Sequence, residues 1–537
     1  LKIRQFDRYS LIVGMAGKHC NLDSHHEMFK EHFPKFSGAS VSKLMVDIVV
    51  PFAAPSWPLD VRKPALDCVG LVCQSSPRNY VAANVYTAFQ QVFDDQIPIL
   101  ETMVLRSLKE FLFSEEKRSE QEPEGPAGKD GESKKKRELT VIGGTNYDDV
   151  ASATTHRFLK DITRIATSTQ DDHAFLAVEV LASINRQGLV HPKETGVTFI
   201  TLATSTHPRI SELAFLEHKA LHTKHETVIE REYAKAIQSI FAYQRDIVKD
   251  PRGATTNPFT PKLHLFMEVL KISKAKNRVK FLEKLVSQID FDIAKLDMSE
   301  ELPPHVQYSR FIIENLAFFE YVTVGEIHSL VAAMERLVAS TGASVAQVIE
   351  SEVFHLRIDV LDAPSSQSPN PDGQLRAEAQ TQGQVNPLLP DIEYSRLRQL
   401  TAASMILLAI WEVRTYLRRL YSLGTNRREN SAKPAKPQVK DLARPPVKVQ
   451  GVTGDKVWEE VNNIMGALSG GRERMVRACK DLVELMSIDK EFLVPSEEDE
   501  MDLDAAGEEN EFGDESDWEE GDDDMASSAG TPSGTGR

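Results

Sequence analysis

The feature that most constrains this chain is a succession of helices that are each apolar on one side only. The pattern is clearest between Gln187 and Val248, where short breaks containing Pro192 and Pro208 separate segments with apolar residues at helical spacing. A helix of this kind gains most of its stability by packing its apolar face on neighbours. The segment therefore predicts helices stacked side by side.

The same spacing recurs through most of the first 355 residues, whereas alternating strand patterns are nearly absent. Two segments, 59–66 and 208–215, can be aligned so that Val61 matches Ile210 and Ala65 matches Ala214. A β-branched residue followed by a small Ala four positions later is typical of the inner helix of a HEAT repeat. We therefore predict an all-α HEAT-repeat superhelical solenoid, which exposes long curved faces to partners.

Composition divides the chain further, because several segments are charged or rich in Pro, Gly and Ser and lack apolar periodicity. We expect HEAT repeats at 1–113 and 147–356, disordered segments at 114–146 and 357–391, a long helix of a C-terminal repeat at 392–424, a basic Pro-rich extended segment at 425–454, C-terminal helices at 455–490 and an acidic disordered tail at 491–537.

The formal net charge of -17 belongs to one place in the chain. Residues 497–524 hold 17 acids and no Lys or Arg; without them, 63 acids balance 63 bases. The low pI therefore does not argue against a polyanionic partner for the rest of the chain. Two hypotheses fit the tail: it competes with DNA for basic surfaces, or it only aids solubility.

Other features narrow the class of protein. Four scattered cysteines suit a reducing compartment. The longest apolar run, Ala402 to Trp411, is about half of the ~20 residues that a membrane span needs, so we expect no membrane association. Nucleotide-binding, zinc-protease and serine-hydrolase motifs are missing, which predicts a protein that is not an enzyme and has no cofactor. The first residue is Leu1, and we expect the C-terminal part of a longer protein.

The stretch from Gln187 to Arg231 resembles the C-terminal region of the cohesin loader family, Nipped-B or sister chromatid cohesion protein 2, and its fungal members most closely. The similarity extends from about Val41 to about Leu485. The residues that carry it are Gln187, Gly188, Leu189, Val190, Pro192, Leu202, Thr204, Ser205, Ile210, Ser211, Ala214, Phe215, His218, His222, Lys224, His225 and Glu226.

The resemblance implies a hook-shaped superhelix that binds double-stranded DNA and the SMC heads and kleisin subunit of cohesin. It implies a nuclear, chromatin-bound protein that promotes cohesin loading and stimulates the cohesin ATPase. It also implies that the loader's partner subunit binds an extreme N-terminal region, which we expect this chain to lack. The alternative is a general HEAT-repeat scaffold of the transport-receptor or phosphatase type, which binds protein only.

Two basic clusters are candidates for DNA binding. Between Lys262 and Lys284 there are seven bases and two acids, and several of these bases fall where one helix ends and the next begins. Such a cluster neutralises phosphates without reading sequence, although an ordinary solvated helix face is the alternative. The candidates in this cluster are Lys271, Lys274, Lys276, Arg278 and Lys280.

The second cluster lies in the basic Pro-rich segment, whose prolines favour an extended chain. Because Val447, Val449 and Val452 follow it, we predict a docked segment whose valines pack between helices; the alternative is a solvated linker. The candidate DNA-binding residues here are Arg427, Arg428, Lys433, Lys436 and Lys440.

His218, His222 and His225 share a helix face at i, i+4 and i+7, a spacing that could hold Zn²⁺. No Cys or further His cluster lies nearby in the sequence to complete a tetrahedral shell. We therefore predict no metal, and histidines bonded to backbone or to Glu at a repeat junction.

Overall fold

The computed structural model describes residues 2–33, 36, 38, 40–121, 146–354, 392–423 and 442–488. Over these ranges the chain is built from helices and contains no strand, and the predicted all-α fold is confirmed. The helices of the N-terminal half are α1 (Lys2–His19), α2 (His26–His32), α3 (Val41–Val49), α4 (Leu59–Ser75), α5 (Ala83–Asp95), α6 (Pro98–Gln121), α7 (Asn146–Ser168), α8 (Asp172–Arg186), α9 (Pro192–Leu202) and α10 (Pro208–Tyr243). Those that follow are α11 (His264–Leu270), α12 (Ala275–Ser287), α13 (Pro304–Phe318), α14 (Val324–Leu337), α15 (Ala343–Glu352), α16 (Tyr394–Leu420), α18 (Gly454–Met465) and α19 (Gly471–Ile488).

The breaks seen in the sequence are helix starts. Pro192, Pro208 and Pro304 each occupy the first turn of a helix, where the missing N–H has no intrahelical partner to lose. Asp171 caps α8 by accepting a hydrogen bond from the N–H of Ala174 at 2.9 Å. Proline and capping residues thus fix where these four helices begin.

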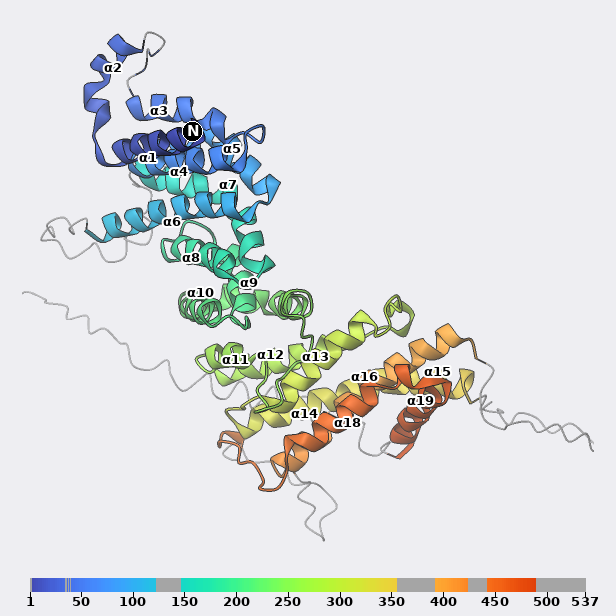
Figure 1. Ribbon diagram of the computed structural model, residues 1–537. Helices are drawn as coiled ribbons and strands as arrows, with labels where there is room; N and C mark the ends of the chain where they lie inside the picture. The colour runs from blue at the N-terminus through green and yellow to red at the C-terminus, as the bar shows by residue number, and fades with distance from the viewer. Residues whose placement is uncertain are drawn as a thin grey trace, which may run out of the picture.

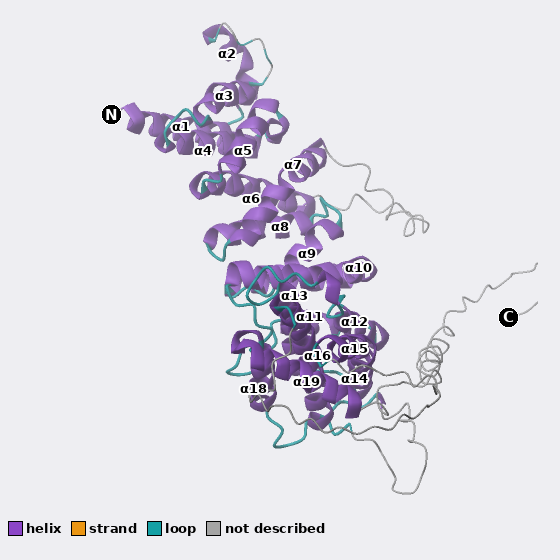
Figure 2. Ribbon diagram, turned by 90° about the vertical axis from the view of Figure 1, so that its right-hand side faces the viewer, coloured by secondary structure: helices purple, strands orange, loops and turns teal. Residues whose placement is uncertain are grey.

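The helices pile up into a bent solenoid (Figures 1 and 2). The stack descends from α1 to α10, and the axis turns aside where α13 to α19 form its lower end, which gives the predicted hook. Val61, Ala65, Ile210 and Ala214 are all buried near the starts of α4 and α10. Helix α4 packs against α1 and α6, and α10 packs against α9, so both helices that begin with this spacing have neighbours in the stack.

The lower end is organised around α16, which packs against α13, α14, α18 and α19. In the described part of the chain, α16 alone has the length and apolar composition of a membrane span. However, 72% of that apolar stretch is buried inside the protein, as expected for the central helix of a soluble core.

One predicted boundary is wrong. The expected disordered segment begins at 114, but α6 continues to Gln121. The reason is that charged side chains sustain this last stretch: Glu115 is buried and pairs with Arg118, and Glu116 accepts a hydrogen bond from Arg186 of α8 at 2.9 Å. A helix can thus continue without apolar periodicity when its carboxylates meet bases.

Several predicted segments lie outside the described residues. These are 122–145 of the first expected disordered segment, the second one at 357–391, the first part of the basic segment at 425–441 and the acidic tail at 491–537. The expected long helix at 392–424 corresponds to α16, and the expected helices at 455–490 correspond to α18 and α19.

Candidate nucleic-acid interface

Helix α12 presents a row of lysines on the side opposite its core face. Phe281, Leu282, Leu285 and Val286 are buried against the solenoid. Lys276, Lys280 and Lys284 are exposed at i, i+4 and i+8, so they follow one another along the outer face.

Lys274 is exposed at the N-cap position of the same helix. Among the described residues, no carboxylate lies within 4.0 Å of the amines of Lys274, Lys276, Lys280 or Lys284. We call these four residues the lysine row. Their charges are available to an external anion.

Arg278 has a different role from the one predicted. Its side chain is only 8% exposed, and its Nε donates to Oε1 of Glu326 on α14 at 2.7 Å. A second guanidinium nitrogen donates to the carbonyl of Ser273 at 2.5 Å. Arg278 therefore holds the start of α12 against α14, and it is inaccessible to DNA.

Lys271 also differs from the lysine row. Its amine lies 2.5 Å from Glu268 and 3.7 Å from Glu320, and the hydrogen bond to Glu268 is the main reason that its pKa is raised. The carboxylates of Glu268 and Glu320 neutralise the charge of Lys271, which therefore adds little to the positive surface. Of the five candidates in this cluster, Lys274, Lys276 and Lys280 remain as exposed cations.

The positive surface continues onto two neighbouring helices that the sequence analysis did not connect with it. On α14, Arg336 lies 3.5 Å from Glu283, which sits within the lysine row. Next to Arg336, Glu335 accepts hydrogen bonds from Arg414 and Arg418 of α16 at 2.6 and 3.0 Å. These ion pairs link α12 to α14 and α14 to α16.

Residues 442–453, which we call the strap, lie along the edge of this surface. The carbonyl of Arg444 accepts from the N–H of Val324 at 3.0 Å, and the N–H of Val449 donates to the carbonyl of Leu420 at 2.7 Å. The strap is thus docked across the start of α14 and the end of α16. Its predicted packing is only partly right, because Val452 contacts the core whereas Val447 is 79% exposed.

The strap places one further cation beside the surface. Burial is the first cause that lowers the pKa of His328 on α14, and the charges of Arg418 and Arg444 lower it further. We call the whole surface the basic face. It comprises Lys274, Lys276, Lys280, Lys284, Arg336, Arg418 and Arg444; Glu283 and Glu335 lie among these cations, and Glu226 and Glu230 contact the first turn of α12. The candidates Arg427, Arg428, Lys433, Lys436 and Lys440 lie outside the described residues.

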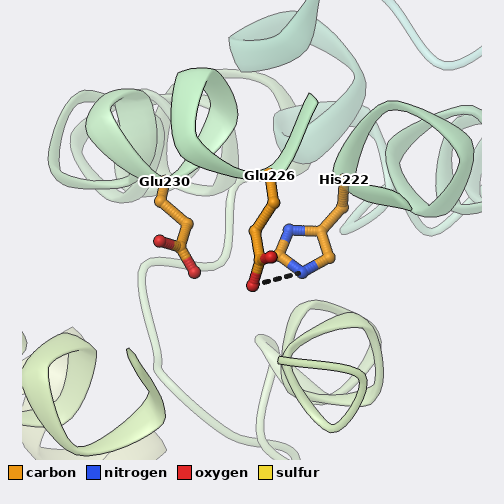
Figure 3. Close-up of side chains that lie close together, drawn as sticks. All are labelled: His222, Glu226 and Glu230. Atoms are coloured by element: carbon orange, nitrogen blue, oxygen red, sulfur yellow. Dashed lines mark ion pairs between the residues drawn. The ribbon is translucent and has the colours of Figure 1, made fainter. Parts of the chain in front are cut away.

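Of the three histidines, His222 lies in a polar junction with Glu226 and Glu230 (Figure 3). Helix α10 is broken at His225, which is exposed and points no ligand toward the other two histidines. His222 is buried and has Tyr233 Oη 2.7 Å from its Nδ1 and Ser273 Oγ 2.7 Å from its Nε2. The side chains whose ligand atoms group with those of His222 belong to Glu226 and Glu230, and not to His218 or His225.

The hydrogen bonds at this junction favour a structural role. Among the described residues, the hydroxyl of Tyr233 has only Nδ1 of His222 as an acceptor, so Nε2 carries the proton and donates to Ser273. Asn277 of α12 donates to Glu226 at 3.3 Å and to Glu230 at 3.1 Å. The junction therefore binds the first turn of α12 to α10 and sets the position of the lysine row.

Comparisons with known proteins agree with this architecture. Residues 151–337, which include α12 and α14, match the family described as Sister chromatid cohesion C-terminus. The structure superimposes on the C-terminal fragment of the cohesin loader SCC2 of Chaetomium thermophilum with a TM-score of 0.73 and 81% sequence identity. This chain belongs to the cohesin loader family.

The match to the Chaetomium fragment covers 91% of this chain and 30% of the fragment. More distant loader relatives are sister chromatid cohesion protein mis4 of Schizosaccharomyces pombe, 24% identical over 218 residues, and the human Nipped-B-like protein, 22% identical over 329 residues. These matches cover 40% and 60% of this chain, but only 14% and 11% of the two relatives. The name of the mis4 protein and the description of the matched family both refer to sister chromatid cohesion.

Proposed function

We propose that this chain is the part of a cohesin loader that holds duplex DNA on its basic face. The observation that carries the proposal is the lysine row of α12: four exposed amines that have no carboxylate within 4.0 Å among the described residues. Lys and Arg side chains that neutralise phosphates release counterions, and this term dominates binding that is independent of sequence.

The form of the face supports contact with the DNA backbone. Exposed Lys and Arg side chains on helix sides meet phosphates, whereas base reading needs an element inserted in a groove. If all four amines of the lysine row engage phosphates, the logarithm of the association constant falls with the logarithm of salt concentration with a slope of about −3.6.

We further propose that the curved solenoid presents DNA to the SMC heads and the kleisin subunit of cohesin, in the nucleus and on chromatin. In this proposal, ATP hydrolysis belongs to the SMC heads, which the loader stimulates, and the loader's partner subunit binds elsewhere in the family's longer proteins. The similarity to loader proteins favours this assignment over a transport-receptor or phosphatase scaffold.

The first test is a mobility shift with nonspecific duplex DNA. The variant K276E/K280E/K284E reverses three exposed charges without touching buried contacts, so we expect DNA affinity to fall at least about 10-fold near 50 mM salt. The variant K43E/K63E/K160E is the matched control, because it reverses three exposed lysines on α3, α4 and α7, at the other end of the solenoid.

If both variants lost the same DNA affinity, the overall charge of the protein would explain the effect, and the basic face would no longer be the proposed binding surface. Unchanged affinity of K276E/K280E/K284E would do the same. Cohesin is tested separately, by the rate of ATP hydrolysis of the cohesin complex with and without the chain in the presence of DNA.

A further inference from the structure

The basic face is rich in exposed Lys and Arg, and residues 497–524 hold 17 acids without any Lys or Arg. We propose that residues 497–524 bind the basic face of the same molecule and that duplex DNA displaces them. The proposal rests on the proposed function, because it assigns a regulator to the same DNA-binding surface.

Charge complementarity is the first argument. Residues 497–524 carry 17 carboxylates and no Lys or Arg, so the segment resembles a phosphate backbone in the sign of its charge. The lysine row has no carboxylate partner within 4.0 Å among the described residues. The four amines would gain partners without breaking an existing ion pair.

Position is the second argument. The last described helix, α19, packs on α16, α16 packs on α14, and α14 packs on α12. Three steps between packed helices amount to roughly 25–30 Å. Glu497 follows Ile488 by nine positions, and a fully extended chain over that interval spans up to about 30 Å. The acidic segment therefore begins within reach of the basic face, and its 28 residues extend that reach.

Attachment to the same chain makes the competition effective. A tethered segment meets its site at an effective concentration that reaches the millimolar range for short connections. Contacts between exposed charges are weak individually and are screened by salt. Duplex DNA has a higher charge density than the acidic segment. DNA that contacts the basic face through several phosphates can therefore displace the segment, whereas DNA that contacts it through few phosphates cannot.

The first experiment needs no DNA. Carbodiimide joins a Lys amine directly to a carboxylate in contact with it, and mass spectrometry of the full chain identifies the pairs. We expect crosslinks from residues 497–524 to Lys276, Lys280 and Lys284 in preference to exposed Lys43, Lys63 and Lys160. An equal mixture of light and isotopically heavy chain decides whether the linked residues belong to one molecule, because links within one molecule give no mixed-isotope pairs. Mixed-isotope pairs as frequent as same-isotope pairs would show links between molecules and overturn the proposal in favour of a second copy.

The second experiment measures DNA affinity. A full-length variant in which the 17 acids are replaced by Asn and Gln keeps the chain length. We expect it to bind duplex DNA about 5- to 20-fold more tightly than the natural sequence near 50 mM salt, with the difference shrinking as salt rises. In the K276E/K280E/K284E background, neutralising the acids should change affinity less than twofold.

The two proposals fail in different ways. If DNA binds through the basic face while neutralising the acids changes neither affinity nor crosslinks, the tail proposal falls and the proposed function stands. If neither protein binds DNA but the crosslinks persist, the proposed function falls and the intramolecular contact stands. A gain in affinity that persists in K276E/K280E/K284E would show general repulsion of DNA by the tail and overturn the specific contact.

Discussion

At the scale of single residues, His218 shows how far burial can shift a side chain from its ordinary behaviour. It is fully buried in α10, its ring stacks on Phe266 at 5.6 Å, and neither ring nitrogen has a hydrogen-bond partner in the described structure. Burial is the main cause that lowers the pKa of His218 to about 3, and His222 adds to it. The imidazole thus stays neutral in the folded protein at pH values where an exposed histidine is charged.

This shift predicts acid sensitivity. Because the folded pKa of about 3 lies below the ordinary 6.5, the unfolded chain binds more protons between these values, and stability falls as pH decreases from about 6.5 toward 3. The loss amounts to about 2 kcal/mol at pH 5. His218→Leu should weaken this dependence, as measured by thermal unfolding at pH 7.5 and 5.0.

The control for this prediction is His156→Leu, an exposed position on α7 that should leave the pH dependence unchanged. If His218→Leu kept the full acid sensitivity of the natural sequence, the buried imidazole would not be its source.

Arg278 provides a second prediction at this scale. Arg278→Met should destabilise the protein by about 3–5 kcal/mol, because Glu326 would remain buried without its cation. In R278M/E326Q, the neutral Gln still accepts from the N–H of Val322, now 2.9 Å from Glu326, so most of the stability should return. Thermal unfolding measures both variants. If Arg278→Met were as stable as the natural sequence but bound DNA more weakly, Arg278 would have to be counted among the DNA-binding residues.

At the scale of elements, the strap is held by its backbone more than by its valines. Val449 donates its N–H to Leu420, while Val447 points into solvent. Sequence patterning found a docked segment, because an extended chain with regularly placed apolar residues is typical of one. It could not tell which valines would be covered, since that depends on how the surfaces of α14 and α16 meet.

Val449→Pro should therefore detach the strap, because proline removes the N–H that bonds to Leu420 and leaves that carbonyl without its donor. We expect a cost of about 1–3 kcal/mol and faster hydrogen exchange at the N–H of Val324, which donates to Arg444. Val447→Ala is the matched control and should stay within about 0.5 kcal/mol of the natural sequence. Equal effects of the two substitutions would mean that side-chain contacts hold the strap.

At the scale of the whole molecule, the sequence predicted the architecture better than the interface. The one-sided apolar periodicity, and the small Ala four positions after Val61 and after Ile210, predict stacked helices. The reason is that each helix needs neighbours to cover its apolar face. The lysine row was also visible, since its members are close in sequence. The sequence did not reveal that Arg278 is buried, because its partner Glu326 lies 48 residues away. It did not connect Arg336 and Arg418 with the lysine row, because only the packing of α14 between α12 and α16 brings them together.

The central position of α16 has a consequence for protein synthesis. This helix is apolar enough to resemble a membrane segment, and helices that follow it in the chain, α18 and α19, help to cover it. A stop codon between α16 and α18 would release a product whose most apolar surface is open to water. Such a product should aggregate or be degraded, so that nonsense mutations there would remove the protein even though the lysine row precedes them in the chain.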